Sequence, residues 1–317
     1  MLKAAIVGLS LATVAAGYGA DPRFVPPPGK VLLLVGQSVD DIQDYQKKVS
    51  TNPGGLMGYT SVERAEGLKL PADEGGGTQH LQKLIDKNPD TVLQIGLWMV
   101  NDAANVAREK MDPQLDQLSA WIQNTHRPVY LRIGYEFDGP HNHYPPEDYI
   151  QAYHHIVDRF RKNGVSNVAF VWHSYASRLT RPLTDWYPGD DYVDWFGISY
   201  FNQPQSYMQP MIDLAKAHGK PVMIAEGSPW VIQTKYANSW NLWFKPLFKF
   251  IAANDIKALC YINCNWDTTP QFRHQRWGDT RIQSNAEILK QWLDETGQDR
   301  YLKASPDLYK SLGYFNE

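Results

Sequence analysis

Two glutamates stand where short, apolar, β-rich runs of the sequence end. Glu226 follows the run PVMIA, and glycine, serine and proline come directly after it. Glu136 closes the run VYLRIGY in the same way, and Asp138 stands two residues further on. An ionised carboxylate is costly beside an apolar segment unless a partner satisfies it or a reaction uses it. These two glutamates are therefore the candidate chemical groups of the chain.

A pair of carboxyl groups in one site is suited to breaking a glycosidic bond. One group must be protonated to donate to the leaving oxygen, while the other must be ionised to attack the sugar or to activate water. Taken singly, either glutamate could instead be a structural acid paired with an arginine of the same sheet, such as Arg132. The occurrence of both at strand ends favours the catalytic interpretation.

The elements that must position these glutamates form a regular alternation. Eight apolar runs rich in β-forming residues recur along the chain, and polar stretches with helical spacing, such as residues 148–162, lie between them. This pattern predicts an α/β fold, a single-domain (β/α)8 TIM barrel. A doubly wound sheet is the alternative, but no glycine-rich phosphate loop follows the first run. The expected strands cover residues 31–38, 56–61, 91–99, 128–136, 167–175, 193–201, 221–228 and 256–266.

In a TIM barrel the C-terminal ends of the strands form one mouth, which carries the functional side chains. Both glutamates are expected there, together with aromatic residues whose faces stack on sugar rings. The side chains predicted to contact a sugar are Trp98, Tyr135, Asp138, Trp172, His173, Trp230 and Trp266.

Charge and cysteine content limit the possible partners. The 317 residues carry a formal net charge of −3 and contain no basic run that could neutralise phosphates, so nucleic acid is not expected as a partner. Cys260 and Cys264 fall in one expected strand, where about 13 Å would separate their α-carbons, too far for a disulfide. We expect two buried free thiols, no metal, no cofactor and a monomer.

The first twenty residues predict a secretory signal peptide. Lys3 supplies the positive start, an apolar stretch covers residues 4–16, and small residues follow. The stretch is too short to span a membrane, so a secreted protein without a membrane anchor is expected. Residues 21–317 then form the catalytic domain, and the polar, proline-rich residues 21–30 are expected to be an exposed leader.

Several segments, in chain order, resemble glycoside hydrolase family 26 of clan A: RIGYEFDG, YPGDDYVDWFGISYF, KPVMIAEGS and INCNWDTTP. The resemblance covers about residues 36–285 and implies a retaining hydrolase of β-linked polysaccharide, of the β-mannan or β-glucan type. It further implies that Glu136 is the acid/base and Glu226 the nucleophile. Tyr200 matches the tyrosine that hydrogen-bonds the nucleophile, and Trp266 matches the aromatic floor of the subsite where the bond breaks.

One motif departs from the family pattern. Where the mannanase motif reads His-Glu-Met-Asn-Gly, this chain has Tyr135-Glu136-Phe137-Asp138-Gly139. The change leaves the acid/base in place and alters its neighbours, which tune sugar recognition. For Asp138, hydrogen bonding to substrate and pairing with an arginine both remain open.

The retaining mechanism has geometric and electrostatic consequences. It requires the two carboxyl groups to lie about 5 to 5.5 Å apart, whereas about 6.5 to 9.5 Å would indicate inversion. Glu226 stays ionised if Tyr200 and Arg132 donate to it, and burial together with its charged partner raises the pKa of Glu136.

Two other functions are compatible with parts of the sequence. A metal-dependent hydrolase could use His141 and His143 together with His173 and Asp267, but the first two lie in a proline-flanked loop rather than on strand ends. A catalytically inactive barrel could bind sugar only, yet a pure binding site does not need two mutually repelling carboxylates.

Overall fold

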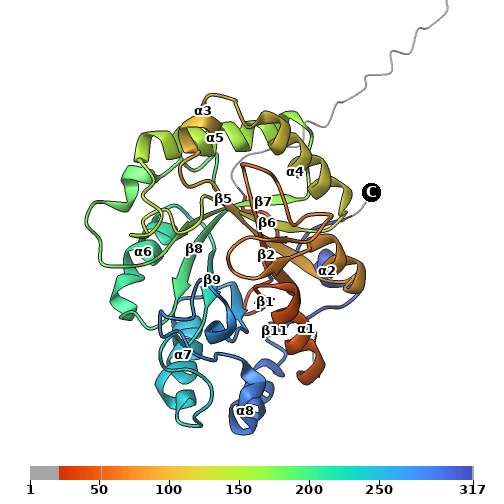
Figure 1. Ribbon diagram of the computed structural model, residues 1–317, viewed down its shortest axis with the longest axis vertical. Coiled ribbons are helices and arrows are strands. Elements are labelled where there is room, and N and C mark those ends of the chain that lie inside the picture. The colour runs from red at the N-terminus through yellow and green to blue at the C-terminus, as the bar shows by residue number, and fades with distance from the viewer. Residues whose placement is uncertain (1–20, 51, 316–317) are drawn as a thin grey trace, which may run out of the picture.

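The computed structural model describes residues 21–50 and 52–315, and it shows a closed barrel of eight parallel strands surrounded by helices (Figure 1). The first and last strands of the barrel pair with each other in parallel, which closes the sheet. The predicted (β/α)8 barrel is therefore confirmed. Its strands are β1 (Val31–Gly36), β2 (Gly55–Ser61), β5 (Val92–Trp98), β6 (Val129–Ile133), β7 (Val168–Ser174), β8 (Trp195–Tyr200), β9 (Val222–Gly227) and β10 (Ala258–Ile262).

Helices cover the outside of the barrel, and several begin where the sequence places a proline. Pro146 opens α5 and Pro246 lies in the first turn of α7, where the missing amide hydrogen costs nothing. The helices are α1 (Val39–Lys48), α2 (Leu81–Lys87), α3 (Ala103–Ala107), α4 (Asp112–Asn124), α5 (Pro146–Lys162), α6 (Gln209–Ala217), α7 (Lys245–Ala253), α8 (Ala286–Thr296) and α9 (Leu308–Ser311).

Short elements complete the loops between these units. The crossover from β7 to β8 contains only the 3₁₀ turn η1 (Leu183–Trp186). A small hairpin, β3 (Ala72–Asp73) with β4 (Thr78–Gln79), lies in the loop after β2. The remaining turns are η2 (Gln205–Tyr207), the π-helical turn η3 (Trp240–Phe244), η4 (Trp266–Thr268) and η5 (Ile282–Ser284), and the short strand β11 (Tyr301–Leu302) pairs with β1.

Side chains of the barrel strands alternate between the barrel interior and the helical layer. In β1, for example, Leu32 and Leu34 lie in the interior cluster, whereas Leu33 and Val35 pack beneath the helices. All four are fully buried, and burying such a side chain stabilises the fold by about 1.5 to 3 kcal/mol. In several strands the interior side chains change from apolar near the start to polar near the end, as from Tyr130 to Arg132 in β6 and from Val171 to His173 in β7.

The segment before β1 closes the N-terminal end of the barrel, contrary to the expectation of an exposed leader. Phe24 is buried, and its ring meets Tyr130 edge to face with 6.2 Å between centroids. The Tyr130 hydroxyl donates to the Phe24 carbonyl at 2.6 Å, and the Trp195 indole donates to the preceding carbonyl at 2.7 Å. One aromatic residue among prolines is enough to anchor the segment because the open barrel end offers apolar surface.

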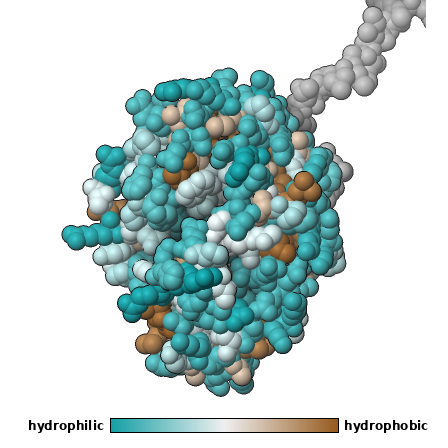
Figure 2. All heavy atoms as spheres, viewed as in Figure 1, coloured by the Kyte–Doolittle hydropathy of each residue, from teal (hydrophilic) through white to brown (hydrophobic). Residues whose placement is uncertain are grey.

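The predicted signal peptide, residues 1–20, lies outside the described residues. Within the described ranges no helix is long and apolar enough to cross a membrane. On the face seen in Figure 2 the surface is mostly hydrophilic, and hydrophobic residues occur only in small separate groups. Cys260 and Cys264 are both buried and free, as predicted.

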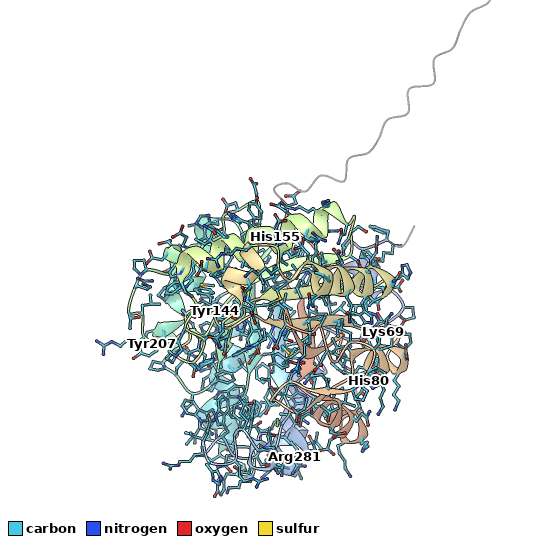
Figure 3. The ribbon with its side chains drawn as sticks, turned by 45° about the horizontal axis from the view of Figure 1, so that its top comes forward. Lys69, His80, Tyr144, His155, Tyr207 and Arg281 are labelled. Atoms are coloured by element: carbon cyan, nitrogen blue, oxygen red, sulfur yellow. The ribbon has the colours of Figure 1, made fainter. Side chains whose placement is uncertain are left out.

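An ion-pair network joins α4 to α5 on the outside of the barrel, where Figure 3 labels His155. Arg159 pairs with both Asp112 and Asp116, and His155 contacts Asp112 at 2.6 Å. The Arg159 guanidinium lowers the pKa of Asp116 to about 2. This network belongs to the helical layer and is separate from the mouth.

Candidate active site

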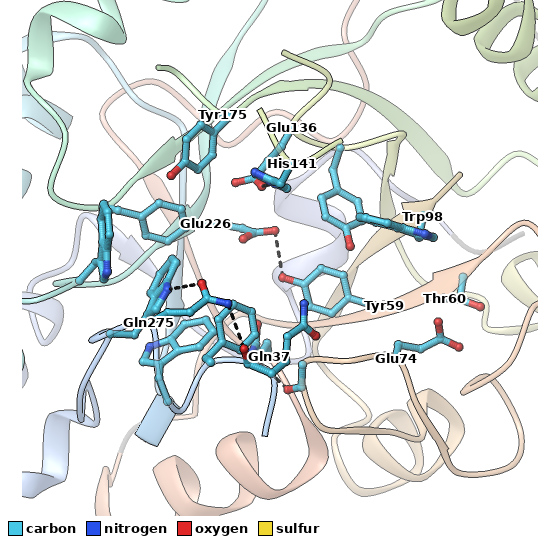
Figure 4. A pocket seen from close by; sticks show the side chains of 18 residues that line it. Gln37, Tyr59, Thr60, Glu74, Trp98, Glu136, His141, Tyr175, Glu226 and Gln275 are labelled. Carbon is cyan, nitrogen blue, oxygen red and sulfur yellow. Dashed lines mark hydrogen bonds and ion pairs between the residues drawn. The ribbon is translucent and has the colours of Figure 1, made fainter. Parts of the chain in front are cut away.

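A cavity of about 590 Å³ opens at the C-terminal ends of the strands, and both glutamates line it (Figure 4). Nine of its eighteen lining residues are aromatic: Tyr59, Trp98, Tyr135, Tyr175, Phe201, Trp230, Trp266, Phe272 and Trp277. Aromatic faces and a few carboxyl and amide groups are a lining that suits a sugar chain.

Glu226 lies in β9 and is held by two donors. Its Oε1 accepts from the Arg132 guanidinium at 2.5 Å and from the Tyr59 hydroxyl at 2.9 Å, the bond drawn in Figure 4. Arg132 is itself fully buried and lies beside the rings of Tyr59 and Tyr135, with its guanidinium carbon 5.3 and 5.0 Å from their centroids. Burial raises the pKa of Glu226 above its ordinary value, while the charge of Arg132 opposes the rise and that of Glu136 adds to it.

Glu136 lies in the loop after β6 rather than in the strand. The strand ends at Ile133 because the chain then turns through Gly134 and Glu136, which both have positive φ, +52° and +53°. The buried Asn142 side chain donates to the Glu136 carbonyl at 2.9 Å and holds this unusual backbone. With its backbone in this left-handed conformation, Glu136 directs its carboxyl group into the cavity.

The two oxygens of the Glu136 carboxyl group have different partners. Oε1 accepts from the Ser199 hydroxyl at 2.5 Å, and Oε2 lies 2.8 Å from Nε2 of His141. Behind them, His173 joins the two glutamate sites, with Nδ1 3.2 Å from the Arg132 guanidinium and Nε2 3.0 Å from the Ser199 hydroxyl. Buried polar side chains thus connect Glu226 to Glu136 without interruption.

Four of the residues predicted to contact a sugar do line the cavity. Trp98 ends β5 and packs against Tyr135 with 5.9 Å between centroids. Trp230 follows β9, and Trp266 lies in η4 after β10 rather than in the strand. The Trp266 indole donates to the Thr280 hydroxyl at 3.0 Å, which fixes its ring in the cavity wall.

Two other predictions were wrong about side-chain direction. Tyr200 does not reach Glu226: it packs beneath the helices against Trp243, and its hydroxyl accepts from Gln205 at 2.7 Å. Trp172 also points outward, stacked on Phe137 with 4.6 Å between centroids. Both residues occupy outward positions of their strands, so the strand period directs them away from the mouth.

His173 and Asp138 lie behind the cavity rather than on it. His173 is fully buried between Arg132 and Ser199. Asp138 accepts from the Ser174 hydroxyl and the Tyr175 amide, both at 2.7 Å, and so neither pairs with Arg132 nor lines the cavity. Burial raises the pKa of Asp138 to about 6.

Several residues of the site were not predicted from the sequence. Tyr59 takes the place predicted for Tyr200, and Ser199, the inward neighbour of Tyr200 in β8, contacts Glu136. Strand parity could have found both, since each stands on the inward face of its strand near the end. Thr60, in β2, also lines the cavity, and the remaining residues, which lie in loops, carried no comparable signal: Gln37, Glu74, Gly76, Gln271, Phe272, Gln275 and Trp277.

Comparison with known proteins identifies the family. The family model described as glycosyl hydrolase family 26 matches residues 80–240. A β-1,3-xylanase from a Vibrio species is 33% identical over 97% of this chain and 74% of that protein. The chain belongs to glycosyl hydrolase family 26.

Other relatives of this family 26 protein agree. A β-1,3-xylanase from an Alcaligenes species is 33% identical over 96% of the chain and 72% of that protein. Among solved structures, a GH26 β-mannanase from Bacteroides ovatus superposes with a TM-score of 0.64 over 89% of the chain and 93% of that chain, at 15% identity. The structural likeness supports the barrel fold, and the family makes the protein a glycoside hydrolase of the endo-glycanase type.

The two loop histidines considered as metal ligands, His141 and His143, do not form a ligand set in this family 26 barrel. His141 faces Glu136 in the cavity, while His143 is exposed and does not line it. Across residues 21–50 and 52–315 no group of three or more His, Cys, Asp or Glu side chains is placed to hold a metal ion.

Proposed function

We propose that the protein is a retaining endo-β-1,3-xylanase in which Glu226 is the nucleophile and Glu136 the acid/base. The observation that carries the catalytic assignment is that two glutamates with different partners share one aromatic-lined cavity. Glu226 is buried and held by a cation and a phenol, whereas Glu136 faces a half-exposed histidine. Different environments for two carboxyl groups are what acid and nucleophile roles require.

The first chemical step forms a glycosyl-enzyme. Oε2 of Glu226, the oxygen not engaged by Arg132 and Tyr59, attacks the anomeric carbon, and the bond from that carbon to the leaving oxygen breaks. The proton of the Glu136 carboxyl group passes to the leaving oxygen, so the departing sugar leaves as a neutral alcohol. Glu226 becomes neutral when it forms the ester, so the positive charge of Arg132 is then no longer balanced by this carboxylate.

The second step reverses these roles. Water attacks the anomeric carbon, its proton passes to Glu136, and the ester bond to Glu226 breaks to restore the carboxylate. Arg132 and Tyr59 then stabilise Glu226 as a leaving group, since both donate to Oε1, which shares the returning negative charge with the released Oε2 by resonance. Two displacements at one carbon retain its configuration.

The substrate is proposed from the relatives. The family resemblance implied β-mannan or β-glucan, but the two relatives that match almost the whole chain carry the name β-1,3-xylanase. Tyr135, which replaces the histidine of the mannanase motif, packs beside Trp98 and over Arg132, so the wall next to the acid/base differs from that motif. We also propose, from residues 1–20, that the protein is secreted.

Release of reducing ends from a polymer panel tests this function. The panel contains β-1,3-xylan, β-1,4-xylan, β-mannan, β-1,3-glucan and β-1,4-glucan, and each is incubated with wild type and with Glu226→Gln. We expect wild type to cleave β-1,3-xylan and the variant to be inactive but folded. Cleavage of another polymer would refute the substrate, full activity of Glu226→Gln would refute the nucleophile, and binding without cleavage would favour a sugar-binding barrel.

A further inference from the structure

Arg132, His173 and Ser199 form a chain of hydrogen bonds that links Glu226 to Glu136. In each bond of this chain, donor and acceptor can be assigned. A guanidinium only donates, so Nδ1 of His173 must accept from Arg132 at 3.2 Å. The pKa of His173 lies well below its ordinary value because of its burial and the charge of Arg132, so the ring is neutral. Its single hydrogen is therefore on Nε2, which donates to the Ser199 hydroxyl at 3.0 Å.

This direction determines which oxygen of Glu136 carries the catalytic proton. Because Ser199 accepts from His173, its own hydrogen is free to point at Oε1 of Glu136, 2.5 Å away. Oε1 is thus committed as an acceptor in both protonation states of the carboxyl group. The proton of the acid must then reside on Oε2, the oxygen that lies 2.8 Å from His141.

The loop that carries His141 is shaped to hold the imidazole at this oxygen. A β-carbon on Gly139 would lie 2.8 Å from Cε1 of His141 and 3.0 Å from the Glu136 carbonyl, so only glycine leaves room for the ring. Asn142 ties the loop to the carbonyls of Tyr135 and Glu136, both at 2.9 Å. On its other side the imidazole meets the edge of Tyr175, with 5.2 Å between centroids.

We propose that His141 is a positioning residue for the acid/base, which together with Ser199 orients the Glu136 carboxyl group so that Oε2 delivers and receives the catalytic proton. This inference rests on the proposed function. Over one catalytic cycle the proton lost from Oε2 to the leaving oxygen is regained from water, so His141 positions the carboxyl group without supplying a net proton. Half of its side chain is exposed, 47%, which places it at the point where a sugar would enter.

The charged and titratable groups around His141 determine its protonation. Burial lowers its pKa, but the hydrogen bond and charge of Glu136, together with the charges of Glu226 and Asp138, outweigh this effect, and its pKa is raised. The Tyr175 hydroxyl remains neutral at ordinary pH, since burial raises its pKa to about 12. His141 therefore keeps a proton to higher pH than a free histidine would, and the single proton in the contact between Nε2 and Oε2 is carried either by His141 or by Glu136, not by both.

Two substrates with different leaving groups can show whether His141 acts by positioning the acid or in another way. A β-1,3-linked xylo-oligosaccharide needs protonation of its leaving group, whereas a 2,4-dinitrophenyl β-xylobioside does not, because dinitrophenolate departs unaided. For His141→Asn we expect kcat/KM on the oligosaccharide to fall by about tenfold or more, the loss typical of a hydrogen bond to a charged group. The value of kcat/KM on the aryl glycoside, which reports only the first step, should stay within about twofold of wild type. His141→Gln, which keeps a donor of similar reach, should restore part of the oligosaccharide activity.

His143→Asn is the matched control, because it makes the same change in the same loop at an exposed residue that does not line the cavity. Equal behaviour of the two Asn variants, or equal losses on both substrates, would overturn the role of His141. Thermal unfolding of each variant checks the fold. If wild type cleaves no β-glycan, or if Glu226→Gln stays active, the proposed function fails instead and the inference fails with it.

Discussion

Replacing Tyr59 by phenylalanine removes one of the two donors that hold Glu226 without emptying the space the ring occupies. The Tyr59 hydroxyl donates to Oε1 of Glu226 at 2.9 Å, and both side chains are buried. The ring also packs on Tyr135 and under the Arg132 guanidinium, contacts that phenylalanine keeps. The variant therefore isolates one hydrogen bond to a charged carboxylate.

The size of the expected pKa shift of Glu226 follows from the free energy that such a hydrogen bond contributes. A hydrogen bond to a charged group contributes about 1.5 to 3 kcal/mol, and one pH unit corresponds to 1.36 kcal/mol, so losing it should raise the pKa of Glu226 by about one to two pH units. Burial already raises this pKa, and Arg132 remains as an opposing charge. The nucleophile must be ionised, so as the pH falls Tyr59→Phe will lose activity at a higher pH than wild type does.

The dependence of kcat/KM on pH reports this change, because it reflects ionisation in the free enzyme. We expect the acidic limb of the profile for Tyr59→Phe to move upward by about one to two pH units, with the basic limb in place. Tyr135→Phe is the control, since Tyr135 lines the same cavity and the structure describes no hydrogen bond from it to either glutamate. An acidic limb that is the same in Tyr59→Phe and wild type would refute the assignment of Tyr59 as a partner of the nucleophile.

Three further predictions concern the loop after β6. Glu136→Gln should lower kcat/KM on β-1,3-xylan by about 10² to 10⁴, the contribution of a general acid, and should impair the first step on the dinitrophenyl xylobioside much less, as pre-steady-state kinetics would show. Gly139→Ala places its β-carbon 2.8 Å from the His141 ring, so it should displace the imidazole and reproduce the substrate dependence of His141→Asn in the same assay. Burial raises the pKa of Asp138 from 3.8 to about 6, so the ionised form costs stability as pH rises through this range. Asp138→Asn should therefore gain up to about 3 kcal/mol over wild type between pH 3.5 and pH 7 in urea unfolding, and a difference that does not change with pH would contradict this.

The strand pattern and the two glutamates could be predicted from the sequence because both depend on local features. Apolar β-rich runs predicted all eight barrel strands, and Glu226 was correctly placed at the end of one. Arg132 was also expected to donate to Glu226 and does so. A barrel brings the ends of its strands together whatever its loops contain, so these positions follow from topology alone.

Side-chain direction and loop packing were harder to predict. Trp172 and Tyr200 were judged by their position near strand ends, but the two-residue period sends them outward, while His173 and Ser199 point inward. His141 could not be placed, because its contact with Glu136 depends on positive φ at Glu136 and on a turn closed by Asn142. Such backbone conformations depend on tertiary contacts that no short segment contains.

Trapping the glycosyl-enzyme tests the central assignment most directly. A 2-deoxy-2-fluoro-β-xylobioside with a dinitrophenyl leaving group forms the ester and then hydrolyses slowly, so the labelled residue can be identified by mass spectrometry of peptic peptides. We expect one sugar per chain, attached to Glu226 in the peptide that contains MIAEGSP, and no label in Glu226→Gln. A label on another residue, or an active enzyme that is never labelled and releases the inverted anomer, would contradict it.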